Sequence, residues 1–274
     1  MTTDAYSLLK VPIPDQKLIH VHSAESELGK IYLPDIAIHA DPNEFSRCLE
    51  NVSGRWEDWF SSARRKYLDS LIAPKQPSMV DMGLVMQYLQ KVLPSDVIIT
   101  NGAGNFAVWP NKFYQFAESS RLLAPQSGAM GYGVPAAIAA KSAFPNRTVV
   151  CFAGDGDFQM TCQELSTAAQ IGIFPIIFIL NNSTYGTIRV HQEKNYPGRV
   201  SCTDIVNPNF TSLAESFGFL GLRVGTTDEF YVAFESALNS ERGAVLDLNV
   251  SSESLVPRQS LSDIRKNALN NQSK

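Results

Sequence analysis

The stretch "FAGDGDFQMTCQELSTAAQIGIFPIIFILNN", residues 152–182, indicates how this chain folds. It begins at the end of the apolar run 148–152 and later contains a second apolar run, 176–180, with a helical pattern over 161–170 between them. Near-continuous apolar strands joined through a crossover helix are typical of parallel sheets that are covered on both faces. The stretch therefore predicts two neighbouring parallel strands.

The same alternation extends in both directions along the chain. Further strand-like runs lie at 18–22, 97–100, 220–224 and 245–250, and further helical patterns lie at 55–71, 80–92, 134–144, 208–217 and 228–240. Alternating strands and helices of this kind predict an α/β fold, a doubly wound and mostly parallel sheet with helices on both faces. We expect its core to run from about residue 77 to residue 250.

The two ends of the chain do not fit this domain. Residues 1–50 offer two short strands and a helix, too little for a core of their own, and we interpret them as the remnant of another domain. Residues 51–78 are predicted as a polar amphipathic helix and a proline-rich linker, with a boundary near 73–78. The main domain is then 79–250, and 251–274 is expected to be a polar tail, partly disordered at its end.

Composition excludes several partners. The 274 residues carry a formal net charge of −4 and have no run of Lys or Arg, which argues against nucleic acid and against a membrane surface. No basic leader and no apolar run of about 20 residues is present in the sequence. We therefore expect a cytoplasmic protein.

Polar residues follow the two strands of the opening stretch. Asp155 comes just after the first strand, between Gly154 and Gly156, and Asn182 comes just after the second. Ligands of open parallel sheets bind beyond the carboxyl ends of the strands, where glycines let the backbone approach closely. A carboxylate beside an anion site requires a cation between them, and Mg²⁺ takes carboxylate, amide and carbonyl oxygens together with phosphates. The pattern predicts a metal-dependent diphosphate site.

Asn182 follows Asp155 by 27 positions, and this GDG–NN spacing resembles that of the thiamine diphosphate-dependent enzymes. The resemblance implies that Asp155, the side chain of Asn182 and the main-chain carbonyl of Thr184 bind Mg²⁺. It also implies that Gly156 and Asp157 donate backbone N–H groups to the diphosphate. Taken alone, GDG and NN would be read as an ordinary turn and loop.

Two further segments resemble the same family. In "LLAPQSGAMGYGVPAAIAAKSAFP" the resemblance implies that Met130 supports the bent cofactor and that the carbonyl of Gly128 binds the aminopyrimidine; the alternative is an ordinary core methionine. "ITNGAGNFAVWPNKFYQF" resembles the first diphosphate loop of the acetolactate synthases, with Gly104 and Asn105 as contacts. Phe106 stands where that subfamily often has histidine.

The resemblance covers the diphosphate-binding domain and, in residues 1–50, the last part of a central domain. The family's pyrimidine-binding domain, whose glutamate promotes ylid formation, has no counterpart in these residues. We therefore assign no catalytic residue, interpret Glu164 as structural, and expect the pyrimidine domain to come from another chain or from a missing N-terminal part, in a homo- or hetero-oligomer. The stretch after Asn182 is polar and interrupted by glycine, which suits a mobile lid. His191, nine positions after Asn182 in this stretch, is a candidate substrate contact where acetolactate synthases carry tryptophan.

These features predict a thiamine diphosphate- and Mg²⁺-binding domain of a decarboxylase or carboligase acting on 2-oxo acids, most similar to acetolactate synthase and inactive as the isolated chain. Neither the acyl acceptor nor the presence of FAD can be predicted. One alternative is a non-catalytic scaffold or regulatory subunit with the family fold. Another is a dinucleotide-binding domain, since "VIITNGAGNFA" has the form of a strand followed by G-x-G-x-x-A, but no acidic residue ends a strand about 20 positions later.

Overall fold

A computed structural model describes residues 9–49 and 53–272 of the chain. The chain forms two compact units, and the division between them falls between Lys66 and Tyr67. This point lies inside helix α2 (Glu57–Ser70), whereas the sequence predicted a boundary in the linker that follows that helix.

The smaller unit contains little buried surface. Its strands β1 (Ile19–His22) and β2 (Ile36–His39) pair in parallel, accompanied by the short helices η1 (Glu25–Glu27) and α1 (Pro42–Arg47). Of the residues described up to Lys66, only Tyr32 is buried. That this segment is the remnant of a central domain stays a prediction.

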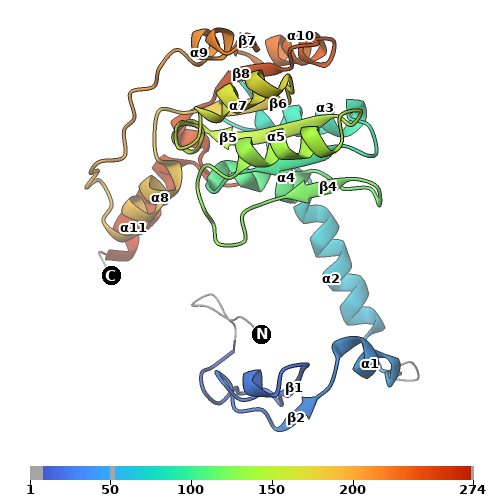
Figure 1. The fold of residues 1–274 in the computed structure, drawn as a ribbon. Helices are drawn as coiled ribbons and strands as arrows, with labels where there is room; N and C mark the ends of the chain where they lie inside the picture. The colour runs from blue at the N-terminus through green and yellow to red at the C-terminus, as the bar shows by residue number, and fades with distance from the viewer. Residues whose placement is uncertain (1–8, 50–52, 273–274) are drawn as a thin grey trace. The chain divides into compact units, whose positions relative to one another are not determined.

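The larger unit is built on one six-stranded parallel sheet (Figure 1). Its strands lie in the order β4-β3-β5-β6-β8-β7 and every neighbouring pair is parallel. Their bounds are β3 Ile98–Asn101, β4 Arg121–Leu123, β5 Val149–Gly154, β6 Ile176–Asn181, β7 Leu220–Val224 and β8 Ala244–Asn249. The predicted doubly wound α/β fold is confirmed; β4 is a strand that the sequence pattern did not indicate.

Helices cover both faces of this sheet (Figure 1). One core contains residues of α3 (Met82–Val92), α4 (Val108–Phe113) and α10 (Thr227–Leu238). The second contains residues of α5 (Gly133–Ala143), α7 (Glu164–Ile171) and α9 (Phe210–Ser216). The remaining elements are η2 (Asn105–Ala107), α6 (Asp155–Gln159), α8 (Gly186–Asn195), η3 (Ser252–Ser254) and α11 (Leu261–Gln272).

An aromatic cluster fixes the strands that carry the predicted site. Phe152 on β5 and Phe178 on β6 are fully buried and meet edge to face, with ring centroids 5.2 Å apart. Phe178 also contacts Phe230 and Phe234 of α10, at 5.4 and 5.6 Å. Such pairs contribute about 0.5–1.5 kcal/mol each beyond the burial of their area. This packing therefore fixes β5 and β6 relative to each other, and with them their carboxyl-terminal ends.

The strand order reverses at β3. From β3 the chain moves outward to β4 and then returns to place β5 on the other side of β3. The loops that leave the carboxyl ends of β3 and β5 therefore run in opposite directions, which opens a crevice between them. Gly102 and Gly154 lie at these two strand ends, so the topology places the predicted site at this crevice.

The two segments expected to be a lid and a tail are helical. The polar stretch after Asn182, expected to be suited to a mobile lid, forms α8, and the expected tail forms η3 and α11. Val190 of α8 packs with Leu255, Leu261 and Ile264 in a small separate core. The expected tail is therefore helical over residues 261–272, because the apolar side chains at 261 and 264 have a partner in α8. The last two residues of the tail, where disorder was expected, lie outside the described residues.

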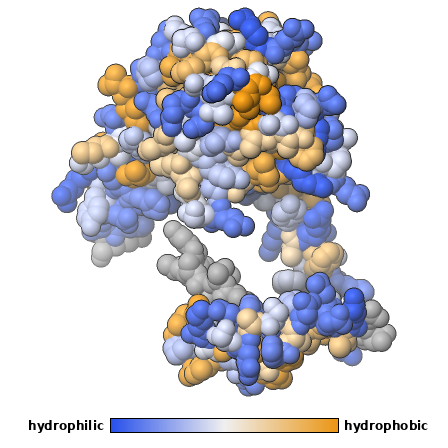
Figure 2. All heavy atoms as spheres, viewed as in Figure 1, coloured by the Kyte–Doolittle hydropathy of each residue, from blue (hydrophilic) through white to orange (hydrophobic). Residues whose placement is uncertain are grey.

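Exposed apolar side chains are distributed among polar ones on the surface of the larger unit. Figure 2 shows hydrophilic residues over much of the face in view, with separate apolar areas between them. Near the predicted site, Met130, Tyr132, Met160 and Ile188 are exposed. Across the described part of the chain, helices that combine the length and the apolar character needed to span a bilayer are absent.

Candidate functional site

A cavity of about 280 Å³ opens at the carboxyl ends of β3, β5 and β6. All ten residues that the sequence analysis assigned to the cofactor line it: Gly104, Asn105, Gly128, Met130, Gly154, Asp155, Gly156, Asp157, Asn182 and Thr184. Ala103, Phe106, Leu180 and the run 185–188 complete the lining. Four segments that are distant in sequence thus meet around one volume.

Asp155 is a buried carboxylate, 2% exposed, at the first position of α6. Its Oδ1 accepts a hydrogen bond from the N–H of Gly156 at 2.9 Å, and its Oδ2 accepts from the N–H of Ser183 at 2.7 Å and from Nδ2 of Asn207 at 2.8 Å. Burial nevertheless raises the pKa of Asp155, and these donors oppose the rise only in part. A cation beside the carboxylate would favour its charged form.

The backbone turns sharply between the two predicted ligands Asn182 and Thr184. Ser183 has a φ of 55°, the left-handed region that non-glycine residues rarely adopt. Its N–H points at Asp155, while Oδ1 of Asn182 accepts from the N–H of Thr184 at 3.0 Å. The turn brings Asn182 to the same cavity as Asp155.

Asp157 joins two of the cavity's segments through its side chain. Its Oδ1 accepts from the N–H of Ala103 at 3.0 Å and from the N–H of Gly131 at 2.9 Å, while its Oδ2 is buried without a partner. Burial raises the pKa of Asp157 to about 6, against the effect of these two N–H donors. A Cβ at Gly102 would collide with the carboxylate, so only glycine lets the loop after β3 pass this close. The sequence indicated a role for the backbone of Asp157, not this one.

Asn105 is tied to the first turn of α8. Its N–H donates to Oγ1 of Thr187 at 3.0 Å, and that hydroxyl donates to Oδ1 of Asn105 at 3.0 Å. Nδ2 of Asn105 is left buried without a protein partner. The amide group thus presents an unused donor, which suits a phosphate oxygen. Thr187 was not predicted, because a single threonine in a helix carries no signal of this contact.

Phe106 forms an apolar wall of the cavity. A Cβ at Gly104 or at Gly154 would lie 2.6 or 2.8 Å from its ring. The ring therefore packs closely against both backbones, and it brings no polar group to the position where the acetolactate synthases often have histidine. Both glycines are needed to leave room for it.

Met130 lies at the rim of the cavity and is 38% exposed. An ordinary core methionine would be buried, so the structure excludes that interpretation. Gly128 has a φ of 66° and Gly131 a φ of 84°, which places Met130 between two left-handed turns. A Cβ at Gly131 would lie 2.9 Å from Met160 and from Thr161, so the bend is fixed by close packing.

Two residues named in the sequence analysis do not line the cavity. His191 is exposed on α8. Glu164 is the first residue of α7, and its Oε2 accepts from Oγ1 of Thr167 at 2.8 Å. The geometry gives Glu164 a local structural role, and a substrate contact by His191 stays a prediction.

The residues around the cavity suit a magnesium diphosphate group. Within residues 9–49 and 53–272, no group of three or more His, Cys, Asp or Glu side chains could hold a metal ion. The predicted set is of another kind, one carboxylate with an amide oxygen and a carbonyl oxygen, and Mg²⁺ completes such a set with phosphate oxygens and water. The unused donor of Asn105 and the under-compensated carboxylate of Asp155 fit the phosphate and the cation respectively.

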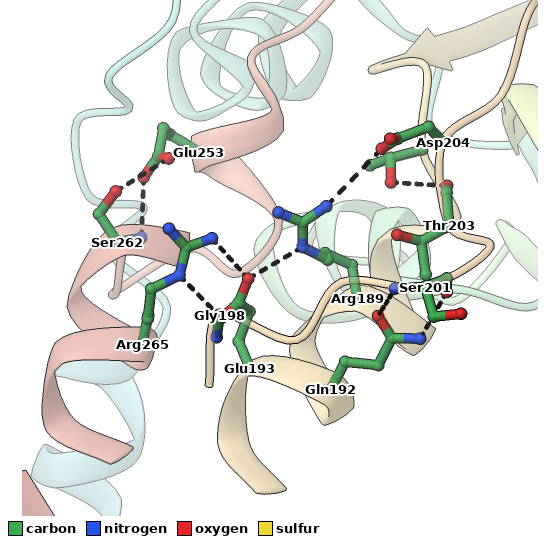
Figure 3. Close-up of polar contacts among 11 residues, drawn as sticks. Arg189, Gln192, Glu193, Gly198, Ser201, Thr203, Asp204, Glu253, Ser262 and Arg265 are labelled. Atoms are coloured by element: carbon green, nitrogen blue, oxygen red, sulfur yellow. Dashed lines mark hydrogen bonds and ion pairs between the residues drawn. The ribbon is translucent and has the colours of Figure 1, made fainter. Parts of the chain in front are cut away.

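A buried ion-pair cluster holds α8 against α11 (Figure 3). Glu193, 1% exposed, accepts hydrogen bonds from Nε of Arg189 at 3.0 Å, from Nε and Nη2 of Arg265 at 2.8 and 2.5 Å, and from the N–H of Gly198 at 2.9 Å. Arg189 also pairs with Asp204, 3.6 Å away. Because α8 begins directly after the 182–185 turn, α11 helps to fix that turn through Glu193.

We expect Glu193→Gln to lower the free energy of unfolding by about 2–3 kcal/mol at pH 7, since it removes several charge-assisted hydrogen bonds from a buried site. The arginines, Arg265 first, lower the pKa of Glu193 from its ordinary 4.5 to about 2. The stabilisation is therefore complete above pH 4.5 and is lost as the pH falls towards 2.

Urea unfolding of parent and variant at several pH values measures this. Asp96→Asn is the matched control, because Asp96 is in a half-exposed pair with Arg147, whose bonds to the Asp96 carbonyl remain. We expect less than 1 kcal/mol there. Equal losses in the two variants would contradict a special role for Glu193.

Comparison with known proteins places this geometry in a family. Residues 102–248 match the family model described as thiamine pyrophosphate enzyme, C-terminal TPP binding domain. The acetolactate synthase large subunit of Buchnera aphidicola subsp. Schizaphis graminum is 32% identical over 264 residues, 92% of this chain and 46% of that protein. That of Corynebacterium glutamicum is 33% identical over 262 residues, 89% of this chain and 41% of that protein.

A solved structure agrees with these relatives. The thiamine diphosphate-dependent 4-hydroxybenzoylformate decarboxylase of Rhodococcus jostii RHA1 superposes with a TM-score of 0.66 at 26% identity, over 86% of this chain and 44% of that one. The chain thus spans less than half the length of the relatives cited here. The family match covers more than half of the chain and includes β5, β6 and the turn after them. The chain belongs to the thiamine pyrophosphate-dependent enzymes, contains their C-terminal cofactor-binding domain, and is similar to the acetolactate synthase large subunits.

Proposed function

We propose that the chain is the diphosphate- and Mg²⁺-binding part of a 2-oxo acid decarboxylase or carboligase. The observation that carries this proposal is the cavity at the carboxyl ends of β3, β5 and β6, lined by the residues of all three family segments. Asp155, Asn182 and the carbonyl of Thr184 would hold Mg²⁺. The backbone N–H groups of Gly156 and Asp157, with Gly104 and Asn105, would hold the diphosphate.

Each part of the site has a distinct task in this proposal. When bound, thiamine diphosphate supplies the electron sink for breaking or forming a bond at the 2-oxo carbon. Asp155 neutralises the cation, and the unused Nδ2 donor of Asn105 binds a phosphate oxygen. Phe106 and Leu180 line the cavity with apolar surface, which excludes water from one wall. Met130 and the Gly128 carbonyl orient the rings.

The proposal also includes a partner domain and a cellular location. A pyrimidine-binding domain, in another chain or in a longer form of this one, would supply the glutamate that these 274 residues lack. Met130 and Ile188 line the cavity and are exposed, so the cavity mouth has apolar surface for such a partner to cover. We propose an oligomer for this reason, and a cytoplasmic location from the sequence features described above.

A non-catalytic scaffold is the second candidate. It is favoured by the apolar Phe106, which lines the cavity where the resemblance leads us to expect a polar residue of the diphosphate loop. A dinucleotide site is disfavoured by the structure, because β4 ends at Leu123 and is followed by Ala124 and Pro125 rather than by an acidic residue. Titration calorimetry of the purified chain with thiamine diphosphate and Mg²⁺ distinguishes the first two candidates. Saturable binding supports the enzyme domain, and no heat at millimolar ligand would overturn it.

We expect Met130→Ala to keep the affinity for thiamine diphosphate within severalfold but to disturb the cofactor's conformation. The side chain is apolar and lies at the cavity rim, so its loss removes apolar support rather than charge. The measurement is the aminopyrimidine circular dichroism of the enzyme assembled with a pyrimidine domain, where the bands should be lost.

Met160→Ala provides the matched control for that experiment. Met160 is equally an exposed methionine near the site, 49% exposed, but it does not line the cavity. Its variant should retain the bands. Unchanged bands in Met130→Ala would show that Met130 gives the cofactor no support.

A further inference from the structure

A chain of hydrogen-bonded amides lies behind Asp155. Asn207, in the loop between α8 and α9, donates through Nδ2 to Oδ2 of Asp155 at 2.8 Å and to Oδ1 of Asn181 at 2.9 Å. Asn181, the last residue of β6, donates through Nδ2 to Oδ1 of Asp247 at 2.9 Å. Asp247 is a buried residue of β8, 8% exposed. Two amides thus connect two buried carboxylates.

The charges at the two ends determine how the amides are oriented. A carboxylate only accepts hydrogen bonds, so Asp247 requires that Asn181 turn its NH₂ group toward it. Oδ1 of Asn181 then faces Asn207, which must turn its own NH₂ group toward both Asn181 and Asp155. Oδ1 of Asn207 is occupied as well, since it accepts from Nε2 of Gln159 at 2.8 Å. Each polar atom of the Asn207 amide therefore has a partner.

The segment that carries Asn207 also supports the turn between the predicted metal ligands. The N–H of Ile205 donates to the carbonyl of Ser183 at 2.9 Å, and the carbonyl of Thr203 accepts from Oγ1 of Thr184 and from the N–H of Tyr185, both at 2.8 Å. Figure 3 shows Thr203 and Asp204 on this segment. Residues 203–207 thus contact both Asp155 and the 183–185 backbone.

We infer that Asn207 is a positioning residue for the metal-binding carboxylate of Asp155, with its own orientation set by Asn181 and Asp247. The inference rests on the proposed function and deepens it. The first asparagine of the NN pair is then no metal ligand; it transmits the orientation from Asp247. Asn207 acts by holding one carboxylate oxygen, so that the other oxygen and the remaining lone pairs present a fixed geometry to Mg²⁺.

The alternative is that these bonds only hold the loop in place, and a second asparagine in the same loop separates the two possibilities. Asn209 caps α9, accepting from the N–H of Ser212 at 3.1 Å and from Oγ1 of Thr211 at 2.7 Å. It makes no described contact with Asp155. Asn209→Ala should therefore reproduce the loss of loop stability, a fall of about 2–4 °C in melting temperature, without touching the metal site.

The experiment compares Asn207→Ala, Asn207→Asp and Asn209→Ala in the full 274-residue chain. The readout is the apparent Kd for Mg²⁺ at a fixed excess of thiamine diphosphate, measured by calorimetry, together with the melting temperature of each ligand-free variant. We expect Asn207→Ala to weaken Mg²⁺ about tenfold or more, as for other outer-shell partners. The isosteric Asn207→Asp should weaken it further, because it presents a carboxylate where Asp155 needs a donor.

Asn209→Ala should bind Mg²⁺ within twofold of the parent. Mg²⁺ affinities that are equal in Asn207→Ala and the parent, or that fall equally in Asn207→Ala and Asn209→Ala, would overturn the inference and leave the proposed function standing. A parent chain that shows no Mg²⁺-dependent binding of thiamine diphosphate would overturn both.

Discussion

Replacing Asp155 by Ala is expected to weaken the binding of thiamine diphosphate in the presence of Mg²⁺ by more than tenfold, about 1.4 kcal/mol or more. The carboxylate is the only negatively charged group of the predicted metal set, and it is 2% exposed. Without it, the cation and the diphosphate would be held by neutral oxygens and backbone donors alone. Charged ligands of this kind dominate the affinity of hard cations.

The role of the metal can be isolated within the same experiment. In the presence of EDTA the parent chain and Asp155→Ala should bind thiamine diphosphate with the same low affinity, because the carboxylate acts through the cation. The difference between them should reappear when Mg²⁺ is restored. A loss that persists in EDTA would indicate that Asp155 supports the fold of the cavity rather than a metal.

Asp228→Ala is the control for the loss of one negative charge. Asp228 is exposed in the first turn of α10 and does not line the cavity. Its variant should bind within twofold of the parent. Circular dichroism of each variant checks that the chain is folded, which matters because Asp155 also accepts hydrogen bonds from Ser183 and Asn207. Unchanged affinity in a folded Asp155→Ala would refute the site assignment.

The centre of the sheet could be predicted from sequence because strands β3, β5, β6 and β8 are buried on both faces. Strands β5 and β6 are apolar at almost every position, and their predicted ranges match the observed ones within two residues. Strand β4 escaped because it has three residues at the sheet edge, the first of them the exposed Arg121. A strand that short gives no periodic signal, and its place in the sheet comes from pairing with β3.

Helices α8 and α11 were not predicted from the sequence, for a different reason. Both have polar sequences, and each has only a few apolar side chains, which become buried when the two helices pack together. A pattern read within one segment cannot show that Glu193 on one helix will meet Arg265 on the other, 72 positions away. The stability of these helices is tertiary, so local sequence predicted a lid and a tail instead.

The residues that line the cavity could be predicted where they belong to a sequence motif. Spacing and resemblance identified Asp155, Asn182 and their neighbours, and these residues do line one cavity. The residues around them, Asn207 and Asp157 above all, act through side-chain hydrogen bonds whose partners lie 26 to 54 positions away in sequence. Such contacts depend on the positions that the loops adopt in the folded chain. A local sequence pattern does not predict these positions.

Within residues 9–49 and 53–272, no glutamate lines the cavity and could take the place of the one that a pyrimidine domain would provide. Glu193 is ionised and held by two arginines, with its pKa lowered to about 2, so it has no proton to give at neutral pH. Glu164 does not line the cavity and accepts a hydrogen bond from Thr167. A positioned proton-transfer group typically contributes 10²–10⁴-fold to a rate, so its absence should be severe.

We therefore expect the purified 274-residue chain to consume no measurable pyruvate with thiamine diphosphate and Mg²⁺, even where calorimetry shows that the cofactor binds. Its cavity mouth, with Met130 and Ile188 exposed, should also make it associate with itself or with a partner, which sedimentation would detect.

Adding a separately expressed pyrimidine domain of an acetolactate synthase should restore consumption by at least a hundredfold over background. The same domain with its glutamate changed to Gln should bind equally and restore none, because it completes the surface but not the proton transfer. Substantial turnover by the chain alone would contradict this assignment. It would require a proton donor from a residue that does not line the cavity.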